Sequence, residues 1–502
     1  MTTQFAIAIG LVLYVVLTTG VSFLMMMRVK KPADYLVAGR GLPYWVLTGT
    51  IIGTCIGTGV IIGGTGLAYQ HGWAGCAYPI GLGIGTLLTG LFFSGMRRYK
   101  FMTLSEEIAC YYERHPVIVE FSNISLFLSQ LCWLTVQIMG GATVVWAVTG
   151  LSPKICVVLA GFAKAAISIP GGLKAVVYTD VLQTVILFCG FGFLMYSALK
   201  DVGGISGLRQ DVPPQYFSFL GIESRGLWNV LSLIVVLALN PIADPGRRLT
   251  IYSAHSERSA KWSMITSGIA VILFSVVIGI TGMYTFHLNP KLPTTDQALP
   301  WLVMNVLPPW LAGFVVVAVV SGMSSAANGN AAAAGTFFVR HIYPLVTGKY
   351  PERPIVVVRW SLACAFLAST TLALYTRNIV DFVVKFLPLT MSGLGVIILL
   401  GRFWKRANWQ GALAALVVTP LVALAVMYIP GQAKFWGNGT IPAIAAGFLS
   451  QVIVSLITAP GRVGFAEVAE AMDRERSAIE SKTVGISAEK IAAVPTTDPK
   501  LV

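Results

Sequence analysis

Three serine residues lie close together in one apolar stretch of this 502-residue sequence. Ser321, Ser324 and Ser325 occupy positions i, i+3 and i+4, so a helix would place their hydroxyl groups on one face. Hard cations such as sodium prefer oxygen ligands, which buried hydroxyl and carbonyl groups supply with little net charge. Serines in apolar helices also bond to their own backbone or pack against neighbouring helices. On these residues alone, a cation site and a packing role both remain open.

An acidic residue, Asp180, lies a few residues inside another apolar stretch, in the sequence GGLKAVVYTD. An unpaired carboxylate in a membrane-spanning helix is unfavourable by about 2.5–3.5 kcal/mol on insertion scales. Asp180 therefore needs a cation, a polar partner or water. The two alternatives are a cation ligand and a carboxylate near the membrane surface that bonds to Lys174, Tyr178 or water.

Residues 44–70 form an apolar segment of membrane-spanning length that contains seven glycines. Each glycine inside a helix is unfavourable by roughly 1 kcal/mol relative to alanine, and exposed backbone groups find no water in hydrocarbon. Such a segment is understandable if its unwound backbone binds a ligand, as in the broken helices of secondary transporters. Thr58 and Gly59 lie in the interrupted part and are predicted to contact a solute.

A second apolar stretch, residues 227–252, is interrupted by prolines and a glycine in the sequence NPIADPGRR. The two interruptions are predicted near residues 53–59 and 240–246. Asn240 and Pro241 mark the second one, where the Asn240 amide and freed backbone groups could bind a solute at the middle of the membrane. A proline kink capped by the asparagine is the alternative.

Asp244, in the same stretch, is a candidate ligand for a positively charged solute. Arg247 and Arg248 follow at i+3 and i+4, where helical neighbours form ion pairs. A local ion pair at the cytoplasmic mouth is therefore the predicted role of Asp244.

Three further polar or aromatic residues, Gln130, Trp133 and Gln137, share one helical face within residues 118–148. Glutamine can hydrogen-bond a solute, and tryptophan can stack on it or close over it. Interhelical glutamine bonds also hold membrane bundles together, so packing explains the pattern equally well.

The composition requires that these residues be positioned by membrane-spanning helices. Apolar residues make up 56% of the chain and charged residues 11%, whereas soluble proteins average about 25% charged residues. The net charge of +14 is attributed to loop lysines and arginines, so nucleic-acid binding is not predicted. The sequence contains no nucleophile elbow, P-loop or metal-ligand spacing of His and Cys, so an enzyme is not predicted either.

Thirteen transmembrane helices are predicted, and the first is interpreted as a retained span rather than a signal peptide. They lie at residues 4–27, 44–70, 73–96, 118–148, 153–170, 174–199, 227–252, 260–286, 300–338, 354–376, 380–400, 409–428 and 438–458. The lysines and arginines of the short loops favour an outside N-terminus and a cytoplasmic C-terminus.

The predicted fold is an all-α polytopic membrane protein. If the first span is accessory, the interruptions fall in core helices 1 and 6 of a five-plus-five inverted-repeat core. The predicted divisions are an accessory span and cytoplasmic loop, two inverted repeats, two peripheral spans and a cytoplasmic tail with a short surface helix at 465–482. Their bounds are 1–43, 44–199, 200–400, 401–460 and 461–502.

Three widely separated stretches resemble motifs of the sodium:solute symporter family. They are DYLVAGR at residues 34–40, GGLKAVVYTDVLQ at 171–183 and LGRFWKRANWQGA at 400–412. The match covers about residues 28–460. It implies sodium as the coupling ion and a small organic solute as cargo.

The resemblance also implies a set of sodium ligands. They are the hydroxyl groups of Ser324 and Ser325 and the carbonyl groups of Ser321, Gly53 and Ile56.

A second sodium ion is a further possibility that the resemblance raises. In some relatives a carboxylate at the position of Asp180 helps to bind a second sodium ion or guides ion release. Cys55 stands where the proline carriers of the family have aspartate, so ion stoichiometry does not transfer directly.

The sequence therefore predicts sodium-coupled symport of a small solute into the cell by alternating access, in the plasma membrane. Helix N-termini favour anionic groups, so carboxylates and amino acids are favoured slightly over sugars and nucleobases. A proton-coupled carrier of the same fold is one alternative. A transporter-like membrane sensor that acts with a partner chain is another.

Overall fold

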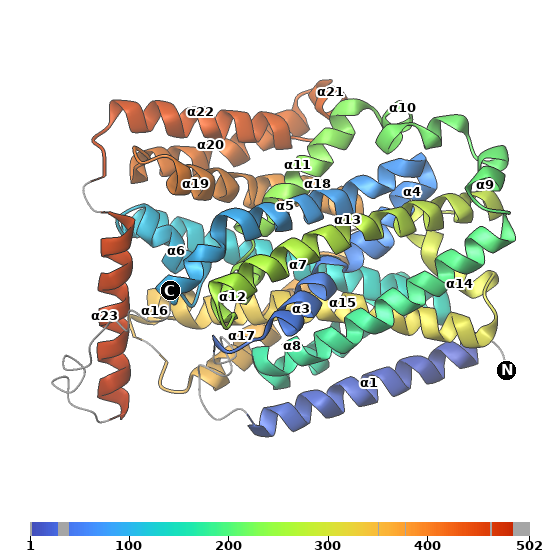
Figure 1. Ribbon diagram of the computed structural model, residues 1–502, viewed down its shortest axis with the longest axis horizontal. Helices are drawn as coiled ribbons and strands as arrows, with labels where there is room; N and C mark the ends of the chain where they lie inside the picture. The colour runs from blue at the N-terminus through green and yellow to red at the C-terminus, as the bar shows by residue number, and fades with distance from the viewer. Residues whose placement is uncertain (1–2, 29–39, 350, 377, 462–463, 485–502) are drawn as a thin grey trace.

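The computed structural model describes residues 3–28, 40–349, 351–376, 378–461 and 464–484. The described residues are mostly helical, and their strand pairing is limited to one isolated parallel bridge between Leu42 and Ala254. Most long helices lie side by side along one direction in Figure 1, with α23 standing across one end of the bundle. The predicted all-helical architecture is confirmed.

The long helices have the following bounds. They are α1 (Thr3–Arg28), α5 (Ala77–Phe93), α7 (Pro116–Thr149), α8 (Pro153–Asp201), α11 (Leu227–Ala243), α13 (Glu257–Leu288), α15 (Pro309–Phe337), α17 (Pro354–Tyr375), α20 (Trp409–Tyr428), α22 (Thr440–Ile457) and α23 (Phe465–Val484). Shorter helices that bear on the site are α3 (Tyr44–Cys55), α4 (Thr65–His71), α6 (Leu104–Tyr111), α12 (Pro245–Ser253), α14 (Ala298–Asn305), α18 (Ile379–Thr390) and α19 (Ser392–Phe403).

Nine helices in the described residues are long and apolar enough to cross a membrane. The number is eleven if each of two bent pairs counts as one span: α11 with α12, bent by 43°, and α18 with α19, bent by 45°. The multi-span prediction is confirmed, but the count differs from thirteen at two places. Residues 44–70 are divided into short helices, and the predicted spans 153–170 and 174–199 are joined in α8.

Helix α8 cannot be straight along its whole length. The Ser168 hydroxyl donates to Asn328 Oδ1 at 2.5 Å, and a Cβ atom on Gly190 would lie 2.5 Å from Ala318 Cβ. The two partners on α15 are separated by about 15 Å of helix, whereas a straight helix would place Ser168 and Gly190 about 33 Å apart. The chain therefore bends between these contacts.

The first predicted interruption is confirmed. Helix α3 ends at Cys55, and Ile56 leaves the helical region with φ of −89° and ψ of 61°. A π-helical turn, η2 (Gly59–Gly64), follows. Glycine is required at position 57 because a Cβ atom on Gly57 would lie 2.7 Å from Ala326 Cβ on α15.

The second interruption is also present, at Asp244 and thus inside the predicted residues 240–246, although Asn240 and Pro241 themselves lie inside α11. Asp244 is extended, with φ of −85° and ψ of 118°, and its carboxylate accepts the backbone N–H of Gly246 at 2.9 Å. This bond caps α12, and Pro245 begins it without losing a helical hydrogen bond. The capping residue, rather than the internal proline, therefore decides where the helix breaks.

Two other predicted segments have definite outcomes. The span 300–338 is divided into α14 and α15, because Pro308 and Pro309 end one helix and begin the next. The predicted surface helix at 465–482 is confirmed as α23. The motif residues Asp34 to Gly39 lie outside the described residues.

Candidate functional site

The three predicted serines are buried on α15, with 0–3% of each residue exposed to solvent. The Ser321 and Ser325 hydroxyl oxygens have no hydrogen-bond partner among the residues that the structure describes. On the same helix, by contrast, the Thr336 hydroxyl donates to its own backbone at Ala332 (2.8 Å). Ser321 and Ser325 therefore keep their oxygens free for a ligand, which argues against the alternative of local backbone bonding.

The end of α3 lies directly against this serine cluster. A Cβ atom on Gly53 would lie 2.7 Å from Ser325 Oγ, and a Cβ atom on Gly322 would lie 2.7 Å from the Ile56 carbonyl oxygen. The last carbonyl groups of a helix have no partner within it. The structure thus brings the Gly53 and Ile56 backbone together with the serine hydroxyls, as the predicted ion site requires.

Asp180, on α8, completes the polar surroundings of the cluster. The residue is fully buried, and neither carboxylate oxygen has a hydrogen-bond partner in the described residues. The carboxyl group lies beside Ser325 and within electrostatic range of Arg247. An unpaired buried carboxylate is costly, so this arrangement favours a cation, a proton or water beside Asp180.

Helices α3 and α8 are tied together around this cluster. The Thr184 hydroxyl donates to the Gly49 carbonyl at 2.8 Å, and the Thr50 hydroxyl donates to the Val177 carbonyl at 3.1 Å. These bonds hold the first half of the interrupted segment in place, so that α3, α8 and α15 surround one group of oxygen atoms.

A small polar cavity of about 20 Å³ lies between the two interruptions, lined by thirteen residues. Four predicted solute contacts line it: Gly59, Trp133, Gln137 and Asn240. Thr58 lies just outside the lining, and its backbone N–H donates to the Gln137 side chain at 3.1 Å. The volume holds one water molecule, so a solute can enter only after the helices separate.

Gln130 contacts the cavity wall instead of lining the cavity. Its amide N–H donates to Asp244 Oδ1 in a long bond of 3.4 Å. The Asn240 amide, on the cavity side, lies 2.9 Å from Met391 Sδ. The predicted face of α7 and the Asn240 side chain therefore both lie at the central cavity. Gln130 contacts Asp244 there, and Asn240 contacts Met391.

Arg247 lines the cavity, a position that was not predicted from the sequence. It is 5% exposed, it donates to the Thr54 hydroxyl, and its Nε atom lies 3.9 Å from Asp244 Oδ2 without a hydrogen bond. The predicted ion pair with Asp244 is present, and both residues line the cavity between the two interruptions. Two consecutive arginines inside an apolar stretch were the available signal.

Tyr78 and Trp133 add two unsatisfied donors to the same cavity. Both residues line the cavity, and within the described part of the chain neither the Tyr78 hydroxyl nor the Trp133 indole nitrogen has a hydrogen-bond partner. Nothing in the sequence around Tyr78 indicated this role, because its position depends on the packing of α5 against Gly59.

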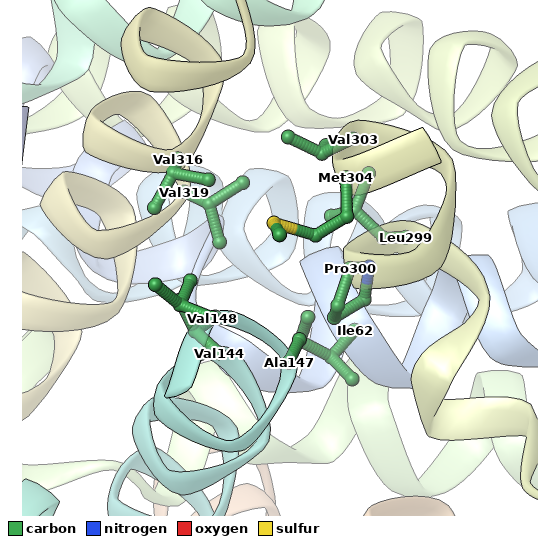
Figure 2. Close-up of a pocket in the computed structure, with 10 residues that line it drawn as sticks. All are labelled: Ile62, Val144, Ala147, Val148, Leu299, Pro300, Val303, Met304, Val316 and Val319. Carbon is green, nitrogen blue, oxygen red and sulfur yellow. The ribbon is translucent and has the colours of Figure 1, made fainter. Parts of the chain in front are cut away.

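A small, purely apolar pocket lies between η2, α7, α14 and α15 (Figure 2). Ten residues line it: Ile62, Val144, Ala147, Val148, Leu299, Pro300, Val303, Met304, Val316 and Val319. The space that they leave, about 10 Å³, is smaller than a water molecule needs. A polar solute finds neither room nor hydrogen-bond partners between these ten side chains.

A profile of the Sodium:solute symporter family matches residues 35–419. The chain is 24% identical over 437 residues to the sodium/pantothenate symporter of Escherichia coli (strain K12), covering 83% of this chain and 89% of that protein. It is 24% identical over 456 residues to the sodium/glucose cotransporter of Vibrio parahaemolyticus, covering 81% of each.

Two solved structures show the same fold. A substrate-bound, outward-open Na⁺-coupled sialic acid symporter matches with a TM-score of 0.79 and 19% identity, over 92% of this chain and 99% of that chain. A nucleobase-cation-symport-1 family transporter in a closed conformation matches with a TM-score of 0.58 and 13% identity, over 88% and 99%.

Proposed function

The chain belongs to the sodium:solute symporter family, and from that premise we propose that it takes up a small carboxylate-bearing solute with sodium by alternating access. Membership makes it a sodium-coupled solute symporter of cell membranes rather than an enzyme. The observation that carries the proposal is the meeting of unpartnered serine hydroxyls with the interrupted end of α3.

The coupling ion binds, in this proposal, between α3 and α15. Its ligands are the hydroxyl groups of Ser324 and Ser325 and the carbonyl groups of Ser321, Gly53 and Ile56. An ion held there fixes the interrupted segment against α15 and so orders the cavity beside it. Solute then binds more tightly in the presence of sodium, and sodium more tightly in the presence of solute, by the same factor.

Asp180 is proposed to bind a second cation. Its two unpartnered oxygens lie beside Ser325, and a positive ion would neutralise a charge that burial otherwise makes unfavourable. Proton coupling through the same carboxyl group is the competing function. Uptake that is independent of sodium and dependent on pH and on Asp180 would favour the proton.

The solute is proposed to bind in the central cavity, against Thr58, Gly59, Gln130, Trp133, Gln137 and Asn240. Arg247 supports the proposal that the solute bears a carboxylate. A guanidinium group binds carboxylates in a bidentate manner, and the Nε donor of Arg247 is unsatisfied among the described residues. Arg247 also lies in the first turn of α12, where the helix dipole favours negative charge. Carboxylates and amino acids are therefore favoured over sugars and nucleobases.

The topology proposed for this function is a five-plus-five inverted-repeat core of thirteen spans with an outside N-terminus and a cytoplasmic C-terminus, in the plasma membrane. The two interruptions then face each other at the cavity, and one repeat moves against the other to expose it to each side in turn. Sensing with a partner chain has no specific observation in its favour.

A thermal-shift screen of the purified protein tests the proposal. Small mono- and dicarboxylates, amino acids, sugars and nucleobases are each added in sodium chloride and in choline chloride. A carboxylate that raises the unfolding temperature only in sodium is the expected result. Stabilisation that is equal in both salts would contradict sodium coupling, and hits confined to uncharged sugars would contradict the role of Arg247.

A further inference from the structure

The C-terminal helix α23 is docked onto the rest of the molecule by one apolar face. Phe465, Val468, Ala469 and Met472 stand at i, i+3, i+4 and i+7, which places them on one side of the helix. Val468 and Ala469 are buried, although α23 stands across the end of the bundle rather than inside it (Figure 1). The helix therefore packs its apolar face against the bundle and leaves its polar face outside.

Phe465 is the residue by which α23 contacts aromatic side chains of the bundle. Its ring centroid lies 4.9 Å from that of Tyr111 on α6 and 5.0 Å from that of Tyr99 at the end of η4 (Ser94–Tyr99). It also lies 6.2 Å from that of Phe101. Aromatic pairs of this geometry contribute more than their burial alone, because ring edges attract ring faces. Phe465 therefore joins α23 to α6 and to the segment that precedes α6.

The rings that Phe465 contacts also belong to a buried network around Glu107 on α6. The Tyr111 hydroxyl donates to the Glu107 carboxylate at 2.8 Å. Phe101 packs edge-on against Tyr252 at a centroid distance of 5.8 Å, and the Tyr252 hydroxyl donates to the same carboxylate at 2.5 Å. Two routes, one through α6 and one through α12, thus lead from Phe465 to one carboxylate.

Arg248 carries this network across the second interruption. Its guanidinium group pairs with Glu107 at 3.3 Å, and its Nε–H donates to the Ile242 carbonyl at 3.1 Å. Ile242 precedes the break at Asp244, and Arg248 follows it. The last carbonyl groups of a helix have no partner within it, so this side chain fastens α12 to the end of α11. Its neighbour in the chain, Arg247, lines the central cavity.

We propose that Phe465 is a positioning residue for the second interruption, and that docking of α23 on α6 holds α12 against α11 and keeps the central cavity closed on the α23 side. This inference rests on the alternating access proposed above, in whose topology that side is cytoplasmic. To expose the cavity there, α12 has to move away from α11, which breaks the bond from Arg248 to Ile242 or the pair with Glu107. Docked α23 opposes this movement because it packs the tyrosine that holds Glu107.

The contact between α23 and the bundle is small enough to be reversible. The Phe465 side chain is only partly buried, and the ion pair that joins Arg114 to Glu475 at 2.8 Å is exposed on both sides. Exposed pairs contribute little to stability. Release of α23 therefore leaves the helices of the bundle folded, and it removes one restraint on α12 without removing the Glu107 network.

Two native cysteines report the two ends of this restraint. The Cys110 thiol, on α6, is buried and lies 3.7 Å from Met472 Sδ, so release of α23 uncovers it. Cys55 is buried and lines the central cavity. The rate of alkylation at Cys110 therefore measures release of α23, and the rate at Cys55 measures opening of the cavity.

The test is alkylation of full-length Phe465→Ala by a membrane-impermeant maleimide, in vesicles oriented with α23 toward the reagent. Peptide mass spectrometry separates the two thiols. Both should react about fivefold faster than in the wild type, which corresponds to about 1 kcal/mol and is the size of an aromatic contact. Phe465→Tyr, which keeps the ring, should restore the wild-type rates. A faster reaction at Cys110 with an unchanged rate at Cys55 would overturn the inference, as would unchanged rates at both.

Vesicles of the opposite orientation separate positioning from general loosening of the structure. From that side the Cys55 rate in Phe465→Ala should not exceed the wild-type rate, because the variant favours opening toward α23. If Cys55 reacts faster from both sides, Phe465 has only a structural role.

Tyr111→Phe is the second variant, and it breaks the route at a different point. It keeps the ring against Phe465 but removes the hydroxyl that donates to Glu107. It should therefore raise the Cys55 rate and leave Cys110 at the wild-type rate, which decides the case even if Phe465→Ala does not fold. A Cys55 rate equal to that of the wild type would contradict the route through Glu107.

Glu470→Gln is the matched control on the same helix. Glu470 lies on the exposed face of α23, where it pairs with Arg474 at 3.5 Å. Both cysteines should react in this variant as they do in the wild type. Faster reaction in Glu470→Gln would show that any change in α23 has the effect assigned to Phe465.

Sodium separates failure of this inference from failure of the proposed function. Cys55 lies between Gly53 and Ile56, whose carbonyl groups are proposed ion ligands, so sodium should lower the wild-type Cys55 rate from the α23 side. If sodium lowers it and Phe465→Ala leaves it unchanged, the role of α23 is wrong and the proposed ion site stands. If sodium has no effect while Phe465→Ala raises the rate, the ion site is wrong and the role of α23 stands.

Discussion

Two fully buried acidic residues, Glu107 and Asp180, have opposite surroundings. Glu107, on α6, accepts hydrogen bonds from the Tyr111 hydroxyl at 2.8 Å and the Tyr252 hydroxyl at 2.5 Å. It also forms an ion pair with Arg248 at 3.3 Å, whose guanidinium lies over the Phe93 ring. Asp180 has no hydrogen-bond or ion-pair partner in the part of the chain that the structure describes.

The difference separates an acid that the protein itself satisfies from one whose oxygens have no hydrogen-bond partner among the described residues. The network around Glu107 links α6 with α12 and the end of α5, and every acceptor that it offers is used. Around Asp180 the neighbouring oxygens of Ser321 and Ser325 are equally unpartnered among the described residues. An ion pair and two tyrosine hydroxyls hold the first carboxylate, whereas the described residues offer the second no hydrogen-bond or ion-pair partner.

The largest expected effect is on folding, from breaking the satisfied network with Glu107→Gln. Removing one member of a buried ion pair leaves the other charge unpaired and destabilises by about 3–5 kcal/mol. Thermal unfolding of the purified variant should show a loss of stability that sodium does not restore. Glu257→Gln, which removes the exposed pair with Arg98 (3.2 Å), should change the unfolding temperature little. If the two variants lowered the unfolding temperature equally, the prediction that the buried ion pair contributes more stability than the exposed one would be wrong.

Asp180→Asn should have the opposite effect on thermal stability. In sodium-free buffer the variant should be at least as stable as the wild type, because the substitution removes an unpaired buried charge. The wild type should gain about 2.7 kcal/mol at sodium concentrations 100 times the dissociation constant, and the variant should gain clearly less. Differential scanning fluorimetry with and without sodium measures both quantities. A variant that is destabilised equally in both buffers would place Asp180 with Glu107 as a structural residue.

A smaller effect is expected from Ser324→Ala and Ser325→Ala. Each should raise the sodium concentration for half-maximal uptake by about tenfold, which corresponds to about 1.4 kcal/mol. Thr336→Val is the control on the same helix, because its hydroxyl bonds only to the backbone at Ala332. Unchanged sodium dependence in both serine variants would refute the placement of the ion.

Asp296 is an intermediate case between the two acids and should give the smallest effect. It precedes α14, accepts the backbone N–H of Ile379 on Oδ2 at 3.1 Å, and leaves Oδ1 unpartnered. Burial raises the pKa of Asp296 to about 6, so the folded state prefers the protonated form.

The sign of the resulting pH effect follows from this preference. Between pH 4 and pH 6 the folded protein retains the Asp296 proton more than the unfolded chain does, so this group's contribution to stability is lost as pH rises. Asp296→Asn should therefore reduce the loss of unfolding temperature between pH 4.5 and pH 7.5 by a few degrees. Glu223→Gln, at an exposed acid on α10 (Ile222–Arg225), is the control and should keep the wild-type pH profile. A profile for Asp296→Asn that matches the wild type would show that Asp296 is already satisfied.

Much of the site was predictable because its residue types and their spacing are unusual for a membrane-spanning helix. Serines at helical spacing, a carboxylate in an apolar stretch and glycines in mid-span are each visible without a structure. The family profile confirmed the sodium:solute symporter prediction, and the structure brought Ser325 beside Gly53 and Asp180. The ligand roles of these residues stay predictions until sodium dependence is measured.

Other parts were not predictable, because they depend on contacts between distant segments. Arg247 was predicted only as the ion-pair partner of Asp244, and its place on the cavity wall depends on the contact of α12 with α3, where it donates to the Thr54 hydroxyl. Phe465 lies in the polar tail of the sequence, and only the packing of α23 against α6 brings it to Tyr111.

The sequence alone determined that the chain lies in a lipid bilayer and roughly where two of its spans are interrupted. Burying a mostly apolar chain requires lipid, and a span that contains seven glycines, or the sequence NPIADPGRR, is unfavourable as one continuous helix. Tertiary structure alone decided which buried oxygens remain unpaired. Whether a hydroxyl or carboxylate finds a partner depends on side chains more than a hundred residues away, and that arrangement distinguishes Asp180 from Glu107.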